Sequence, residues 1–225
     1  MTKQHLIWDL PTRIFHWAFA LVIIGCWATH ELGSEYIDWH MQLGYVAIGL
    51  LCFRVIWGFI GTKHARFASF FPTPTKIKRY LSDDKRKVAG HNPLGSLMVF
   101  AMLVLVMLQA ASGLFIDDEI FTTGPYFNAL GSDVDKVMST IHHNAFDIIA
   151  IAIFVHVAAV VFYQRVKKQN LVKPMVTGYK NEDEINTGDA ISGSKVWLGI
   201  IIALLCAGFV YWLVVINAPV VEEYW

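Results

Sequence analysis

Long apolar stretches separated by short polar segments dominate the pattern along this chain of 225 residues. Five of the stretches reach the roughly 20 residues that an α-helix needs to cross a hydrocarbon layer about 30 Å thick. The predicted spans are residues 14–32, 39–59, 93–116, 139–162 and 195–216. The pattern therefore predicts an all-α integral membrane bundle.

Composition agrees with this prediction, because 56% of the residues are hydrophobic and only 16% are charged. The formal net charge of zero hides a strong separation of charge along the chain. Basic residues gather between the second and third spans and after the fourth, whereas acidic residues gather in the other connections. Because Lys and Arg mark cytoplasmic loops, these basic residues are better explained as topology signals than as a nucleic-acid-binding patch.

The charge pattern also predicts an orientation. The basic loops contain Lys63, Arg66, Lys76, Lys78, Arg79, Lys85, Arg86, Lys87, Arg165, Lys167, Lys168, Lys173 and Lys180. The opposite side carries Glu31, Glu35, Asp38, Asp117, Asp118, Glu119, Asp133 and Asp135, with Glu222 and Glu223 in the tail. We therefore expect a multi-pass membrane protein with a cytoplasmic N-terminus and a C-terminus on the opposite side.

Histidine is the chemically distinctive residue of the predicted spans. A histidine in or at the edge of a membrane helix is costly, so it usually faces the bundle interior and serves a function. His16 and His156 fall at the predicted cytoplasmic depth, and His40 and His142 fall at the periplasmic depth. The four histidines thus form two pairs by depth.

Helical geometry supports a common face for two of them. His142 and His156 are 14 positions apart, which leaves them about 40° apart around the helix and about 21 Å apart along it. His143 is about 140° from His156, so His142 is the better candidate. The 14-residue spacing predicts two sites roughly 20 Å apart.

Two imidazoles on facing helices in an apolar environment suit a b-type haem. No C-x-x-C-H motif is present, which argues against covalently attached haem. A structural zinc site would need further ligands, usually cysteine, and a proton relay would normally add carboxylates. A small transporter or membrane anchor without haem, with interfacial histidines, is the alternative from another class.

Other residues are candidates for the surroundings of a cofactor. Arg13 and Arg54 could pair with anionic propionates, although Arg54 could equally extend its side chain to the interface. Gly44, one turn from His40, could give a flat macrocycle room, although close helix packing is the commoner reason for glycine. His91 could contact a propionate or a quinone, or it could be an interfacial residue. His5, His30, His64 and His143 are expected to be interfacial.

Three features carry a resemblance to the bacterial cytochrome b561 family, which includes the b-type cytochrome subunits of nickel–iron hydrogenases. They are "WDLPTRIFHW" at residues 8–17, "WHMQLGYVAIGLLCFRVIWGFIG" at residues 39–61, and the pair His142 and His156. The resemblance covers about residues 6–180. It implies a four-helix core with two non-covalent haems b, one held by His16 and His156 and one by His40 and His142. It also implies exchange of electrons with quinone and a place in a bacterial inner membrane, with the N-terminus in the cytoplasm and the C-terminus in the periplasm.

The resulting hypothesis has three parts along the chain. Residues 1–176 are expected to form the di-haem domain, residues 177–194 a polar cytoplasmic linker, and residues 195–225 a fifth span with a periplasmic tail. The fifth helix has no histidine, so we expect it to face lipid or a partner subunit. The function expected is electron transfer between the quinone pool and a periplasmic c-type cytochrome, dehydrogenase or hydrogenase subunit. A self-contained quinone-linked oxidase of superoxide is the alternative within the redox class.

Overall fold

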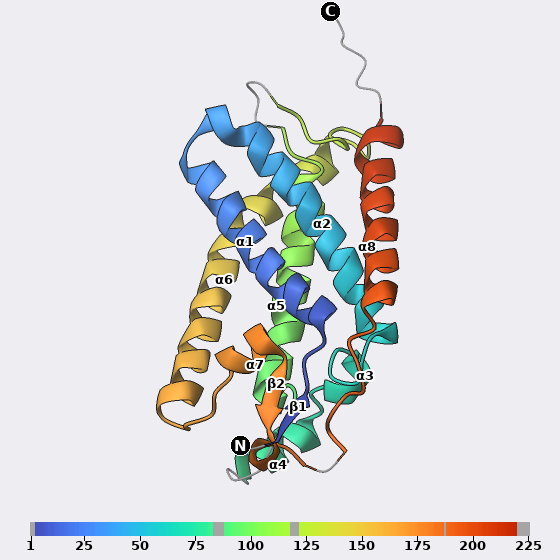
Figure 1. The fold of residues 1–225 in the computed structure, drawn as a ribbon. Coiled ribbons are helices and arrows are strands. Elements are labelled where there is room, and N and C mark those ends of the chain that lie inside the picture. Colours follow the sequence, from blue (N-terminus) through green and yellow to red (C-terminus); the bar gives the residue numbers. More distant parts are fainter. Residues whose placement is uncertain (1–2, 83–87, 118–121, 187, 220–225) are drawn as a thin grey trace, which may run out of the picture. The chain divides into compact units, whose positions relative to one another are not determined.

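The computed structural model describes residues 3–82, 88–117, 122–186 and 188–219 (Figure 1). Among these residues, five helical segments are long and apolar enough to cross a membrane, which confirms the predicted all-α membrane bundle. They are α1 (Leu10–Glu31), η1 with α2 (Ser34–Tyr36 and Ile37–Ile60), α5 (Pro93–Gly113), α6 (Ser132–Arg165), and α8 with η3 (Val196–Tyr211 and Trp212–Ile216). The basic residues 85–87 and the acidic residues 118, 119, 222 and 223 lie outside the described part.

The shorter elements all belong to the connections between these long helices. They are β1 (Gln4–Leu6), α3 (Phe67–Phe70), α4 (Pro74–Ser82), α7 (Val172–Thr177), β2 (Tyr179–Asn181) and η2 (Glu182–Glu184).

The chain packs as two compact units. Unit 1 comprises Met1–Trp17, Arg54–Leu103 and Ala150–Ile202, and unit 2 comprises Ala18–Phe53, Val104–Ile149 and Ala203–Trp225. Each unit therefore contains one part of every long helix. His16 and His156 belong to unit 1, whereas His40 and His142 belong to unit 2.

Unit 1 contains an antiparallel strand pair that the sequence pattern did not predict. In β1 and β2, Gln4 pairs with Asn181 and Leu6 with Tyr179 (Figure 1). Beside the pair, Ile7, Trp8, Ala89 and Ile185 form a buried apolar cluster. Residues 177–194 were expected to form a plain polar linker. Instead, strand β2 of this segment pairs with β1, and Ile185 packs in the apolar cluster with Ile7 and Trp8.

Helix caps explain where several helices begin. The Asp9 carboxylate accepts the backbone N–H of Thr12 at 2.8 Å, which satisfies one free donor of α1. As a result α1 begins at Leu10, four residues before the predicted start. Asn92 caps α5 in the same way, through the N–H of Gly95 at 2.7 Å. Thr73 caps α4, since its hydroxyl oxygen accepts the backbone N–H of Lys76 at 3.3 Å.

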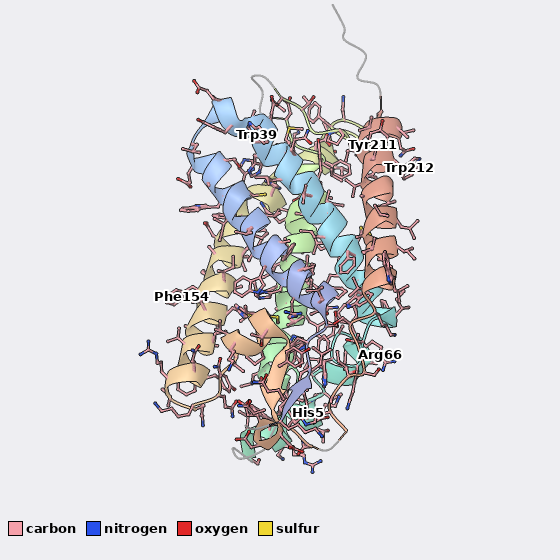
Figure 2. All side chains as sticks on the ribbon, viewed as in Figure 1. His5, Trp39, Arg66, Phe154, Tyr211 and Trp212 are labelled. Atoms are coloured by element: carbon pink, nitrogen blue, oxygen red, sulfur yellow. The ribbon has the colours of Figure 1, made fainter. Side chains whose placement is uncertain are left out.

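The outer surface of the long helices is apolar. Phe154 of α6 is 74% exposed and Trp39 of α2 is 66% exposed, and both side chains project from their helices in Figure 2. Such exposure would be unfavourable in water, but a membrane helix meets lipid chains that are as apolar as leucine. Trp39, Tyr211 and Trp212 lie near helix ends, as aromatic residues at a membrane interface do.

The fifth long helix buries a narrow stripe. Ile202, Cys206 and Val210 are buried at intervals of four residues, while Leu204 and Leu205 between them are exposed. A Cβ atom on Gly199 would lie 2.8 Å from Pro11, so α8 approaches the start of α1 closely within unit 1. The helix thus packs on its own chain along one face and leaves the other face for lipid or a partner.

Candidate functional site

Unit 1 brings His16 of α1 and His156 of α6 together. Their ring centroids are 6.4 Å apart, with 51° between the ring planes. Both residues are partly buried. The Nδ1 atom of His16 is shielded from solvent and has no hydrogen-bond partner within the described residues. The pair expected from depth in the sequence is therefore also a pair in space.

Unit 2 brings His40 of α2 and His142 of α6 together in the same way. Their ring centroids are 6.2 Å apart, with 77° between the planes. The Nδ1 of His40 lies 2.8 Å from the carbonyl oxygen of Cys26, and that of His142 lies 2.9 Å from the carbonyl oxygen of Gln109. Because a carbonyl oxygen only accepts, each Nδ1 carries the hydrogen. Each Nε2 therefore has a free lone pair, the tautomer that a metal-binding histidine with a backbone partner adopts.

Both separations would allow the two imidazoles of a pair to bind one iron. Metal–imidazole bonds are about 2 Å long and a ring nitrogen lies about 1.1 Å from its ring centre, so the centroids should be about 6.2 Å apart. Within the described residues, no group of three or more His, Cys, Asp or Glu side chains could hold a metal ion. Each pair can thus supply two ligands, which suits an iron whose other four ligands come from a macrocycle.

The other histidines have different surroundings. His143 is exposed, and its Nδ1 donates to the Ser139 carbonyl of its own helix at 2.8 Å. His30 is exposed as well, although its ring centroid is 6.1 Å from that of His40. His64 is buried, not interfacial as expected, and its Nε2 donates to the carbonyl oxygen of Asp189 at 2.7 Å.

The two candidate arginines lie in unit 1. Arg54 is only 3% exposed, so its side chain does not extend to the interface. Its guanidinium donates to the carbonyl oxygen of Ala65 at 3.1 Å and lies over the ring of Phe67, 4.7 Å from the centroid. Arg13 donates through Nη1 to the carbonyl oxygen of Val176, and its Nε is shielded from solvent without a partner in the described residues. Both cations keep donors that an anionic group could use.

Gly44 and two glycines near the end of α2 have different surroundings. A Cβ atom on Gly44 would meet nothing within 4 Å, so there is open space beside α2 one turn from His40. At Gly58 a Cβ atom would collide with the ring of Phe67, and at Gly61 with the backbone of Trp57. Close packing therefore explains Gly58 and Gly61, whereas Gly44 leaves room for a flat group.

His91 lies between aromatic rings in unit 1. Its ring centroid is 4.7 Å from that of Trp8 and 4.5 Å from that of Phe70. The residue keeps some exposed surface, but its Nδ1 is shielded from solvent and has no partner among the described residues. Burial, together with the positive charge of Arg54, lowers the pKa of His91 to about 3. The imidazole is therefore neutral at physiological pH and has an unused polar atom.

Comparison with known protein families identifies the family of this chain. The model of the prokaryotic cytochrome b561 family matches residues 7–178. The chain belongs to this family.

Two relatives of this cytochrome b561 chain are named as probable Ni/Fe-hydrogenase B-type cytochrome subunits of Azotobacter species. The Azotobacter vinelandii protein is 30% identical, with 77% of this chain and 87% of the relative covered. The Azotobacter chroococcum protein is 28% identical with the same coverage. A probable Ni/Fe-hydrogenase 1 B-type cytochrome subunit of Escherichia coli is 25% identical, with 52% of this chain and 61% of the relative covered. No solved structure matches the chain.

The sequence reasoning did not assign a role to Asp9, which the structure places at the centre of a buried network. The Asp9 carboxylate is fully buried and accepts hydrogen bonds from the Thr12 backbone and hydroxyl, the Trp57 indole and the Thr62 hydroxyl. In this cytochrome b561 chain the network ties the start of α1 to the end of α2. The Asp-Leu-Pro sequence was a readable signal, since an N-cap residue followed by proline in the first turn marks a helix start.

Proposed function

We propose that this membrane cytochrome b561 holds two haems b and transfers electrons between quinone and a redox partner on the other side of the membrane. The observation that carries the proposal is the pair of imidazole separations, 6.4 Å for His16 and His156 and 6.2 Å for His40 and His142. The first pair joins α1 to α6 and the second joins α2 to α6, and each pair could supply two imidazole ligands to one haem iron. Bound haem would supply reversible one-electron oxidation and reduction of iron at each pair.

The protein residues would hold and orient the cofactors. The Cys26 and Gln109 carbonyls fix the rings of His40 and His142, which keeps each Nε2 free to bind. Two histidine ligands per iron would leave no position for a substrate. The protein would therefore set the reduction potential of each haem and the path of the electrons. Arg54 and Arg13 would place positive charge near the His16 and His156 pair. This charge would bind the haem propionates and stabilise the reduced form of the iron.

The quinone is proposed to react beside the same pair. His91 offers a neutral imidazole with a solvent-shielded Nδ1. The rings of Trp8 and Phe70 lie beside it and would give a quinone ring apolar surroundings. The amide oxygen of Asn92, the next residue along the chain, is used by the cap of α5. His91 is therefore the stronger candidate for a hydrogen bond to a quinone carbonyl.

The orientation and the partner are proposed from charge and from the relatives. The basic loops support a cytoplasmic N-terminus and a periplasmic C-terminus in a bacterial inner membrane. The relatives in Azotobacter are named as hydrogenase cytochrome subunits, so a hydrogenase is the proposed periplasmic partner. A c-type cytochrome or a dehydrogenase subunit would fit the same acidic outer loops.

Reduction of the purified, haem-loaded chain by quinol tests this proposal. Quinol should reduce a low-spin b-type spectrum within seconds, and His91→Phe should slow that reduction at least tenfold while leaving haem content unchanged. Unchanged rates in His91→Phe would contradict the assigned quinone position. Rapid reduction by superoxide, without any partner, would instead identify the chain as a self-contained oxidase.

A further inference from the structure

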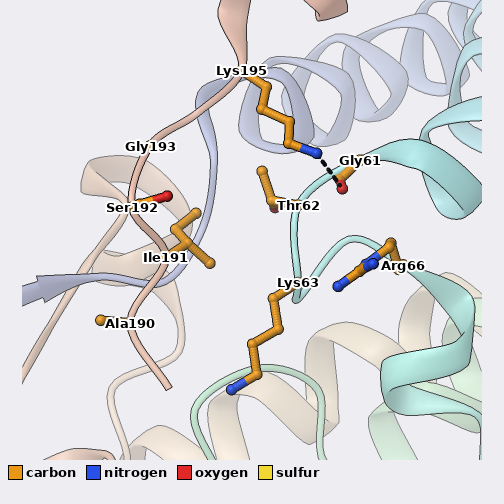
Figure 3. Close-up of a pocket in the computed structure, with 9 residues that line it drawn as sticks. All are labelled: Gly61, Thr62, Lys63, Arg66, Ala190, Ile191, Ser192, Gly193 and Lys195. Carbon is orange, nitrogen blue, oxygen red and sulfur yellow. Dashed lines mark hydrogen bonds between the residues drawn. The ribbon is translucent and has the colours of Figure 1, made fainter. Parts of the chain in front are cut away.

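Unit 1 has a surface pocket of about 360 Å³ that the proposed electron path does not use (Figure 3). One wall is the connection that follows α2, and the other is the stretch that leads into α8. Three cations line it, Lys63, Arg66 and Lys195, together with the hydroxyl-bearing Ser192. We call this site the basic pocket.

The charges of the basic pocket are only partly compensated by the protein. Lys63 forms an ion pair with Asp189, 3.1 Å from nitrogen to oxygen. Among the described residues, Lys195 donates to two neutral carbonyl oxygens, those of Ile60 and Gly61, each at 3.3 Å. Figure 3 shows the bond to Gly61. Arg66 is exposed at the surface in Figure 2, and its guanidinium has no hydrogen bond or ion pair to any residue that the structure describes. The pocket lining contains no carboxylate, so two cations remain for an anion.

The pocket lies at the depth of lipid headgroups. The α2 span ends at Ile60, directly before the first wall, and the α8 span begins at Val196, directly after Lys195. Both spans present apolar side chains to lipid at this level, since Phe59 is 68% exposed and Trp197 is 79% exposed. A tryptophan beside lysine and arginine at a helix end is typical of a membrane interface.

Arg66 also lines a second hollow, of about 410 Å³, together with Gly58 and Phe59. One guanidinium therefore borders a cationic pocket on one side and a hollow against a lipid-exposed phenyl ring on the other. A molecule that filled both would need an anionic group and an apolar chain.

From this arrangement we propose that the basic pocket binds the phosphodiester headgroup of an anionic phospholipid, with an acyl chain along Phe59. Arg66 is the main ligand, because its planar guanidinium can bind two phosphate oxygens. Lys195 adds positive charge. Basic pockets between membrane helices on the cytoplasmic side recognise anionic lipids in this way. The inference needs only the membrane position of the chain and does not depend on haem or quinone.

Native mass spectrometry of the purified full-length protein, titrated with phosphatidylglycerol or phosphatidylcholine, tests the proposal. The unaltered chain should bind phosphatidylglycerol more tightly than phosphatidylcholine. Arg66→Gln should weaken phosphatidylglycerol binding at least about fivefold, because one cation near the headgroup is worth about 1 kcal/mol. Arg66→Lys should fall between the two. The matched control is Arg165→Gln, which removes another exposed arginine of unit 1 that lies in neither hollow and should bind as the unaltered chain does.

Three results would overturn the proposal. The first is equal binding by Arg66→Gln and the unaltered chain, and the second is an equal loss in Arg165→Gln, which would indicate general surface charge. The third is displacement of the lipid by millimolar inorganic phosphate, which would assign the pocket to a free anion. The haem absorbance of the same samples reports separately on the proposed redox function.

Discussion

His40 and His142 face each other with 6.2 Å between their ring centroids. The backbone carbonyl of another residue orients each ring. The carbonyl of Cys26 in α1 accepts from His40, and that of Gln109 in α5 accepts from His142. Four helices therefore contribute to one pair of imidazoles: two carry the rings and two orient them. This is the arrangement expected when ligand orientation has to be fixed before the cofactor binds.

Replacing His142 or His143 distinguishes the ligand from its neighbour. His142→Ala should lower the haem content by about one per chain, because His40 alone would leave an iron with an open axial position. His143→Ala should leave haem content and spectrum unchanged, since its ring is exposed and bonds its own helix. Pyridine haemochrome assay of both purified variants measures the difference. A loss in His143→Ala and none in His142→Ala would reverse the assignment.

Gly113 should be required for the position of the His142 ring. A Cβ atom on Gly113 would lie 2.8 Å from Cε1 of His142, closer than nonbonded atoms normally approach. Gly113→Ala should therefore displace the ring, weaken its bond to Gln109 and alter one of the two haem signals in electron paramagnetic resonance. Gly208→Ala in α8 is the control, because its Cβ atom would meet nothing within 4 Å. Identical spectra for Gly113→Ala and the unaltered chain would show that the ring tolerates the methyl group.

Removing the Asp9 carboxylate should destabilise the fold without touching a haem ligand. Asp9→Ala leaves the Thr12 N–H without its buried acceptor and removes one of the two acceptors of the Trp57 indole N–H, at a cost of about 2–4 kcal/mol. The midpoint of thermal unfolding, followed by circular dichroism, should fall by several degrees. The control Asp183→Ala, which removes an exposed carboxylate from η2, should leave the midpoint unchanged. Equal midpoints for all three proteins would mean that the network contributes little.

Acidification should destabilise unit 1 through His64. Burial lowers the pKa of His64 below its ordinary value of 6.5, so the folded state favours the neutral ring. The neutral His64 ring makes its full contribution to the free energy of unfolding above pH 6.5. This contribution is lost as the pH falls from 6.5 through the lower pKa of the folded state. The unfolding midpoint should therefore fall between pH 7.5 and 5.5, and less so in His64→Gln. The exposed His143→Gln serves as control and should follow the unaltered chain. A parallel fall in His64→Gln would exclude this histidine as the cause.

Arg54 should tune the potential of one haem. Its buried positive charge favours the reduced form of a nearby iron, so Arg54→Gln should lower one midpoint potential by roughly tens of millivolts. The other potential should change much less. Spectroelectrochemical titration resolves the two values, with Arg165→Gln as the surface control. Two unchanged potentials in a folded, fully loaded Arg54→Gln protein would remove Arg54 from the haem surroundings.

The sequence predicted the long helices and the histidine pairs because both follow from simple periodicity. Spans of about 20 apolar residues and a 14-residue interval between His142 and His156 need no tertiary information. The roles of Cys26 and Gln109 were out of reach, because a backbone carbonyl has no signature in the side-chain pattern. The same holds for Arg54, whose burial depends on Ala65 and Phe67 folding back over it. The pairing of β1 with β2 joins residues more than 170 positions apart, which local patterns do not encode.

The most direct test of the account is the ratio of haem to protein in the purified chain, measured by the pyridine haemochrome assay beside a reduced-minus-oxidised spectrum. The account predicts about two low-spin haems b per chain, about one in His16→Ala and about one in His40→Ala. A folded protein without haem, or one whose haem content is the same in both variants as in the unaltered chain, would contradict it.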